Sequence, residues 1–215
     1  MKKLMTLFIV FIMLWVCSPS SGLLLIYRVS TSVRGVDDTT GLTVKVPFKA
    51  YLILDFNSEG VFRDANLMPF GYNSQYSKVY YQLNDSDSDN FLDVSIWGSG
   101  VKYPYLFVGI WCYGEENPFE FEACIWGRMS AKDIGYGPEE LWVVPTSMKG
   151  VFTSWMDMLL DTSQNISGTS TMSAKLDTTA TRLLNAADGT TEDAVSYITG
   201  LLQTAGYSPG TLSIP

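Results

Sequence analysis

The 215-residue sequence contains no histidine, and this absence removes several classes of enzyme at once. Hydrolases whose serine or cysteine relies on an imidazole base are excluded, as are histidine acid–base catalysis and the usual zinc sites with imidazole ligands. Catalysis would have to rely on carboxylates, lysine, tyrosine or serine alone. The composition therefore favours a protein that is not an enzyme.

Basic residues are also scarce. The chain has 14 lysines and arginines against 22 aspartates and glutamates, which gives a net charge of −8. A surface of that sign repels the phosphates of nucleic acids and the anionic headgroups of lipids. We therefore expect no nucleic-acid partner.

The first 22 residues have the three regions of an export signal. Lys2 and Lys3 precede the apolar run 4–16, and the small and polar stretch 17–22 follows it. The apolar run is shorter than the roughly 20 residues that a membrane-spanning helix needs. We therefore predict a signal peptide over residues 1–22, no stable membrane span, and a protein that is secreted or held in the periplasm or cell envelope.

Two alternatives to simple cleavage stay open at this end of the chain. Cleavage is expected after Ser20 or Gly22, but residues 23–26 are also apolar and could extend the run into an uncleaved anchor. Cys17 raises the further alternative of a lipid-anchored mature terminus.

Alternating apolar and polar residues predict that residues 23–176 form a β-rich domain. The pattern is clearest over residues 42–56, where Pro47 indicates either an edge strand or two strands that meet there. Further strands are expected at 62–67, 78–83, 91–97, 105–112, 119–126, 141–144, 149–152 and 171–176. Many short strands separated by turns are typical of an antiparallel sandwich or barrel.

Residues 177–215 change to helical spacing. Asp177 is placed to cap a first helix that ends before Gly189, and Thr190 or Thr191 to cap a second one. The predicted fold is therefore mainly β, an antiparallel β-sandwich or barrel, with two short C-terminal α-helices packed on the same domain.

The dipeptide Ile-Trp occurs three times, each time near the end of a predicted strand. Each isoleucine keeps phase with the apolar face of its strand, so each tryptophan points to the other face. If the strands are neighbours, Trp97, Trp111 and Trp126 form an aromatic strip that could bind an extracellular glycan or another protein. The alternative is that the C-terminal helices or the N-terminal strand cover the strip.

Two glutamates are expected beside this strip. Glu120 and Glu122 share a strand face about 7 Å apart, and pairing Ile110 with Phe121 would set Trp111 opposite Glu120. Two carboxylates on either side of a glycosidic bond can hydrolyse it. A solvated strand face explains the same pattern.

Calcium is the one candidate cofactor. Asp85, Asp87, Asp89 and Asp93 resemble the D-x-D-x-D-G-x-x-D calcium loops of bacterial and extracellular repeat proteins, with Asn90 in place of the usual glycine. The alternative is a solvated acidic hairpin loop.

Cys112 and Cys124 remain after removal of the signal. Export favours a disulfide between them, whereas the strand phase puts the two side chains on opposite faces. The disulfide is left open.

The sequence thus leads to a non-catalytic extracytoplasmic binding or structural module. Its rivals are a carboxylate-dependent polysaccharide hydrolase and a calcium-stabilised envelope component. These three functions would be distinguished by a structure that shows which side of the sheet is exposed to solvent.

Overall fold

The computed structural model describes residues 22–37, 40–57, 61–70, 78–84, 90–97, 105–112, 120–129, 144–156 and 166–210. The predicted signal peptide lies outside these residues apart from Gly22. Its removal, its retention as an anchor and lipidation at Cys17 therefore stay predictions.

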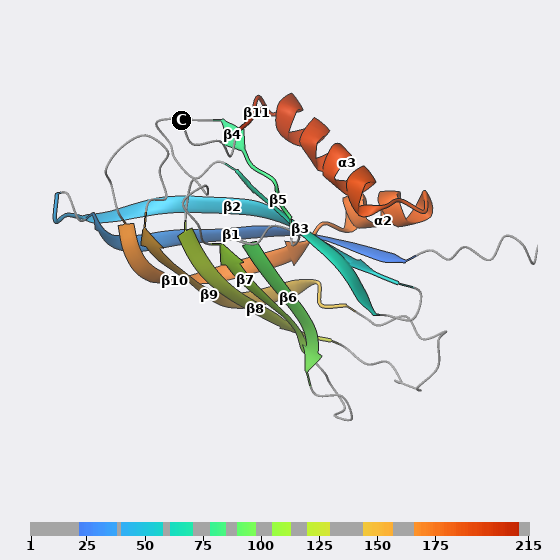
Figure 1. Ribbon diagram of the computed structural model, residues 1–215, viewed down its shortest axis with the longest axis horizontal. Helices are drawn as coiled ribbons and strands as arrows, with labels where there is room; N and C mark the ends of the chain where they lie inside the picture. Colours follow the sequence, from blue (N-terminus) through green and yellow to red (C-terminus); the bar gives the residue numbers. More distant parts are fainter. Residues whose placement is uncertain are drawn as a thin grey trace, which may run out of the picture.

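The described chain forms one mostly antiparallel sheet followed by two helices. The strands are β1 (Leu23–Asp37), β2 (Thr43–Phe56), β3 (Phe62–Phe70), β4 (Val79–Tyr80), β5 (Leu83–Asn84), β6 (Asn90–Trp97), β7 (Tyr105–Cys112), β8 (Glu120–Arg128), β9 (Ser147–Met156), β10 (Ile166–Leu176) and β11 (Ser208–Pro209), and the helices are α2 (Thr178–Ala186) and α3 (Thr191–Thr204). The hydrogen-bonded order is β11-β4-β3-β2-β1-β10-β9-β8-β7-β6, and β5 pairs with β3. The sheet curls into a half-barrel (Figure 1), which confirms the predicted mainly β fold with two packed helices.

The inner side of the curled sheet holds the main core. Phe48 of β2 meets Phe121 of β8 and Phe152 of β9, with ring centroids 5.3 and 4.9 Å away. All three side chains are fully buried. Because three strands separate β2 from β8 in the strand order, these contacts join opposite sides of the curled sheet across one interior.

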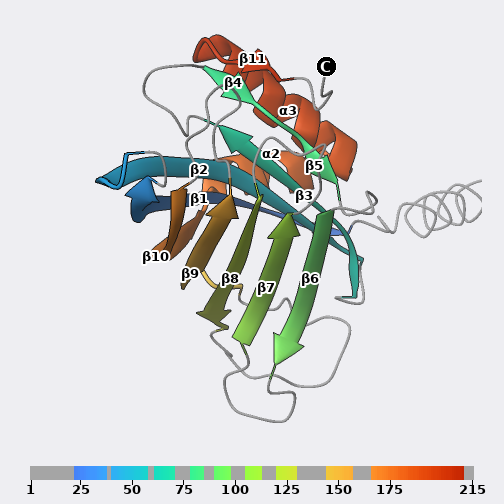
Figure 2. The same ribbon diagram turned by 60° about the vertical axis from the view of Figure 1, so that its left-hand side comes forward.

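A second, smaller core lies on the outer side of the sheet under the helices. Leu24 and Ile26 of β1, with Ile53 of β2, pack there against Leu184 of α2 and Ile198 of α3. The helices lie over β1, β2 and β3, at one end of the strand order, whereas β6 to β9 stand away from them (Figure 2). Neither helix in the described part of the chain has the length and apolar character needed to span a bilayer.

Helix α2 takes the place of a missing strand beside β1. The pairing of β1 with β10 begins at Tyr27, so the backbone of Leu24 and Ile26 extends beyond that pairing. Asn185 accepts a hydrogen bond from the Leu24 amide at 2.9 Å and donates one to the Leu24 carbonyl at 2.7 Å. Thr181 accepts from the Ile26 amide at 3.1 Å, and the Asp177 amide donates to the Ile26 carbonyl at 2.7 Å. All four backbone groups are satisfied.

Both predicted helix caps are present. The Asp177 carboxylate accepts from the Ala180 amide at 3.1 Å and forms an ion pair with Arg28. Thr190 and Asp193 form a reciprocal capping box at the start of α3. Hydrogen bonds from Thr190 lower the pKa of Asp193.

Pro47 does not divide the strand that contains it. Strand β2 runs unbroken through Pro47, which lies opposite Ser32 of β1. Strand β3 pairs with β2 only from Lys49 onward. Among the described residues Pro47 therefore has a paired strand on one side only, as the edge-strand alternative expects, and the two-strand alternative is wrong because β2 is continuous.

Replacing Asn185 with alanine should lower the free energy of unfolding. The change removes three hydrogen bonds, one of them to the Thr181 carbonyl, and leaves the buried Leu24 backbone without its two partners, which costs about 1–3 kcal/mol. Urea denaturation measures the effect. Arg182→Ala, an exposed change on the same helix, is the control and should shift the midpoint little. Equal midpoints for the two variants would refute the role assigned to Asn185.

Candidate binding surface

The predicted phase of strands β7 and β8 is confirmed. Every second residue is buried in the inner core, and the residues between them lie on the outer face. The buried set is Leu106, Val108, Ile110 and Cys112 in β7, and Phe121, Ala123 and Ile125 in β8. Trp111 and Trp126 therefore lie on the outer face of the sheet.

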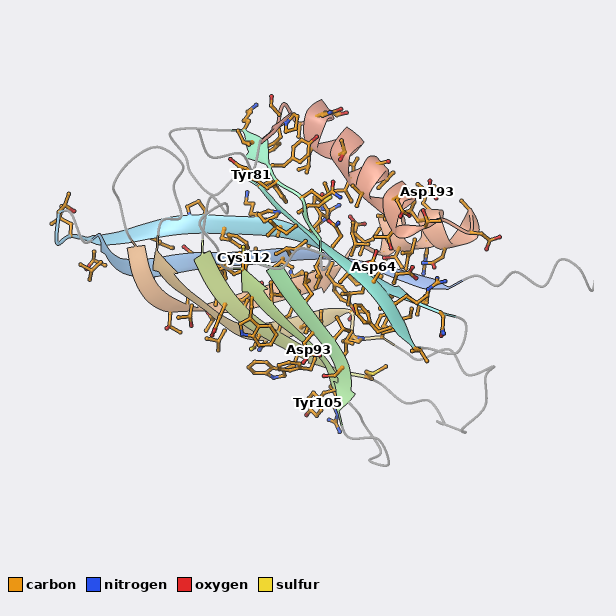
Figure 3. The ribbon with its side chains drawn as sticks, in the orientation of Figure 1. Asp64, Tyr81, Asp93, Tyr105, Cys112 and Asp193 are labelled. Atoms are coloured by element: carbon orange, nitrogen blue, oxygen red, sulfur yellow. The ribbon has the colours of Figure 1, made fainter. Side chains whose placement is uncertain are left out.

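Several large apolar side chains gather on this outer face. Tyr105, Trp126 and Val151 are 44, 41 and 40 % exposed, and Phe107 and Trp111 are half-buried among them. We call these five residues the aromatic face. Tyr105, together with Asp93 of β6, lies on the side of the molecule away from Asp193 and the helices (Figure 3). The described helices therefore do not cover the aromatic face, and β1 lies within the sheet between β2 and β10.

Trp126 has the most central position of the three predicted tryptophans. In the register it lies between Phe107 of β7 and Lys149 of β9. Trp97 ends β6 opposite Tyr105, and its side chain lies outside the described part of the structure. Of the predicted aromatic strip, the structure therefore describes the side chains of Trp111 and Trp126.

The predicted register of β7 against β8 is wrong by two residues. Ile110 pairs with Ala123, so Trp111 lies opposite Glu122 and not opposite Glu120. A shift of two residues leaves every side chain on its original face, so the alternation of apolar residues cannot reveal it.

The indole ring of Trp111 lies over Gly109. A Cβ atom on Gly109 would overlap the indole ring, so the ring occupies the space that a side chain at 109 would need. Gly109 itself faces Asp93 on one side and Cys124 on the other. Burial, and to a smaller degree Glu122, raises the pKa of the Cys124 thiol. The indole ring of Trp111 therefore covers the outer face of the sheet at Gly109, beside Cys124.

Of the two carboxylates considered for catalysis, the structure describes the side chain of Glu122 but not that of Glu120. Glu122 is half-buried on the outer face, between Trp111 and Thr153 in the register. Glu120 pairs with Met156 at a register shift, and its side chain lies outside the description. The separation of the two carboxylates stays a prediction.

The predicted calcium ligands are likewise only partly placed. Asp85, Asp87 and Asp89 lie outside the described residues, and Asp93 lies on β6 opposite Gly109. Within the described part of the chain, no three acidic or cysteine residues are grouped closely enough to hold a metal ion. Calcium binding by this segment therefore stays a prediction.

Sequence reasoning missed Tyr105 and Phe107. They precede Gly109 and Trp111 at every second position of β7, so they share the outer face with the tryptophan. The same alternation of apolar residues that places Trp111 on the outer face also places Tyr105 and Phe107 there.

Comparison of the chain with protein-family models, with curated proteins and with solved structures found no match in any of the three.

Cys112 and Cys124 are not joined by a disulfide and lie on opposite faces of the sheet. Cys112 is buried in the core opposite Phe121, whereas Cys124 lies on the outer face opposite Gly109. The strand-phase argument against a disulfide is therefore correct for this structure.

Thiol labelling should distinguish the two cysteines. In the folded protein we expect Cys124 to react slowly with iodoacetamide, because burial raises its pKa and its side chain is half-buried. Cys112 should react only after denaturation. Peptide mass spectrometry reads out both sites, and a Cys112–Cys124 disulfide in oxidised protein would contradict the structure.

Proposed function

We propose that the chain is a non-catalytic binding module that works outside the cytoplasm, with the aromatic face as its binding surface. One observation carries the proposal: the aromatic face is exposed at a part of the sheet where the helices do not lie. Apolar side chains gathered on the surface of a soluble domain mark sites of interaction. The face lies on regular strands, so its side chains are held in a fixed arrangement before a partner arrives.

The chemistry of the face suits a partner with flat apolar surfaces and hydroxyl groups. Tyr105 and Trp126 offer broad rings and also a phenol oxygen and an indole N–H that can form hydrogen bonds. In the register Arg128 lies opposite Tyr105 and Lys149 lies opposite Trp126. Glu122 lies opposite Trp111. Sugar rings have this combination of apolar faces and polar edges, so we take a glycan as the partner.

The position of Glu122 supports binding more than hydrolysis. Its side chain lies on the outer side of a curled sheet whose inner side is filled by the core. A glycosidase holds its sugar between two carboxylates on either side of the scissile bond. An outward-facing strand surface favours contact along a chain of sugars over enclosure of one bond.

Trp126→Ala should weaken glycan binding roughly tenfold, because it removes the most central ring of the face. Affinities are measured by tryptophan fluorescence and calorimetry with the best ligand from a panel of neutral and charged oligosaccharides. Leu183→Ala is the matched control, since Leu183 is 53 % exposed but lies on α2. Equal affinity of both variants, or no ligand in the panel, would refute this function.

Export should leave a mature chain that begins at Ser21 or Leu23. Strand β1 begins at Leu23, so cleavage after Gly22 would keep the whole sheet intact. Intact mass and N-terminal sequencing of the protein from the culture medium or periplasm test this expectation. Exported protein that begins at Met1 would contradict the signal peptide.

A further inference from the structure

Basic residues gather on one side of this acidic protein. The outer face of the sheet beyond the helices carries seven of the 14 lysines and arginines. These residues, which we call the basic face, are Arg28, Arg34, Lys45, Lys49, Arg128, Lys149 and Lys175, and every one is exposed. A polar surface needs charge for solubility, but acidic residues would serve equally well in a chain of net charge −8.

The strand register joins the basic face to the aromatic face. Consecutive pairings define one row that crosses seven strands on the outer side of the sheet. From β2 to β6 this row reads Lys49, Ser30, Ser173, Lys149, Trp126, Phe107 and Ser95. With strands about 4.8 Å apart, Lys149 lies next to Trp126, and Lys49 lies about 14 Å from Lys149 along the sheet.

The neighbouring row adds charge beside this one. Arg28 of β1 pairs with Lys175 of β10, which pairs with Ser147 of β9. Arg28 also binds Asp177 at the start of α2. Lys175 and Lys149 are both exposed on adjacent strands, so their charges reinforce one another.

The two buried carboxylates on the helix side of the sheet neutralise only one member of the basic face, Arg28. Asp177 is paired with Arg28, and Asp55 is buried in an ion pair with Arg63 at 2.8 Å. Asp55 also accepts a hydrogen bond from Thr191 of α3. Both carboxylates thus lie where the helices meet the sheet.

Hydroxyl groups fill the positions between the basic residues. Ser30 and Ser173 lie 3.3 Å apart across β1 and β10, and Thr153 and Thr169 lie 3.4 Å apart across β9 and β10. Both pairs are exposed. Hydroxyls both donate and accept hydrogen bonds, so this part of the surface can match the hydroxyls of a sugar.

We propose that the basic face and the aromatic face together bind an anionic polysaccharide, one whose sugars carry carboxylate or sulfate groups. The inference rests on the proposed function and names its ligand class. Sugar rings stack on Trp126 and Phe107, and the anionic groups of the following sugars lie against Lys149, Lys175 and Lys49. The surface is long enough for several sugars, because the row crosses seven strands.

The distribution of charge favours this ligand over nucleic acid. Lys49 and Lys149 are separated by the hydroxyl-bearing Ser30 and Ser173, which suits a polymer whose units carry hydroxyl groups as well as an anionic group. A nucleic acid presents its phosphates with few hydroxyl groups beside them, so it matches these serines less well.

The test compares three probes of similar length on the mature chain: uronate oligosaccharides prepared from alginate, neutral manno-oligosaccharides and single-stranded oligo-dT. The uronate should bind at least about tenfold more tightly than the neutral sugar, and its affinity should fall as salt is raised, because salt screens exposed charges. Lys149→Gln should weaken uronate binding roughly two- to fivefold, the range for one exposed ion pair. Arg182→Gln makes the same charge change on α2 and should leave the affinity unchanged.

Three results would overturn the proposal. Equal affinity for neutral and uronate sugars, with no effect of Lys149→Gln, would remove the charged ligand and leave the aromatic binding function in place. Tighter binding of oligo-dT would assign the face to nucleic acid. If neither the uronate nor the neutral oligosaccharide binds, the proposed binding function and this inference are both refuted.

Discussion

The backbone of β1 extends past β10, and helix α2 satisfies the polar groups left there. The side chains of Leu24 and Ile26 are buried under the helices, whereas that of Leu25 between them is buried in the inner core. Backbone amides and carbonyls at such a place cost free energy unless they are hydrogen-bonded. Asn185 and Thr181 supply the bonds, and this requirement sets where α2 lies. Helix α3 follows from it, because only a short turn joins the two helices.

The position of the helices divides the outer side of the sheet into two regions. Under the helices the outer residues of β1 and β2 are apolar, as Ile26 and Ile53 show. Beyond the helices the same strands carry Arg28 and Lys49, and the distant strands carry Trp126. A side chain at an outer position therefore has a different role in each region. The proposed binding surface is the region that the helices leave uncovered.

Local pattern predicted much of this molecule. The alternation that put Ile110 inside and Trp111 outside is confirmed, because neighbouring residues of a strand must face opposite sides. The cap at Asp177 is confirmed for a similar reason, since it depends on bonds within one helical turn. In contrast, the sequence pattern predicts an N-terminal strand but not the bounds of β1. Its residues Leu24 to Tyr27 are buried on both faces, so they show no alternation.

Features that depend on distant residues could not be predicted in this way. The register that sets Trp111 opposite Glu122 depends on how β7 and β8 are aligned, and shifts of two residues look identical in sequence. The row that joins Lys49 to Trp126 depends on the order of five strands, which no local pattern records. Composition and periodicity established a histidine-free, mostly β chain with aromatic residues on one face of its strands. Long-range packing established which of those faces the helices cover, because a helix settles where it buries apolar surface and satisfies a strand edge at the same time.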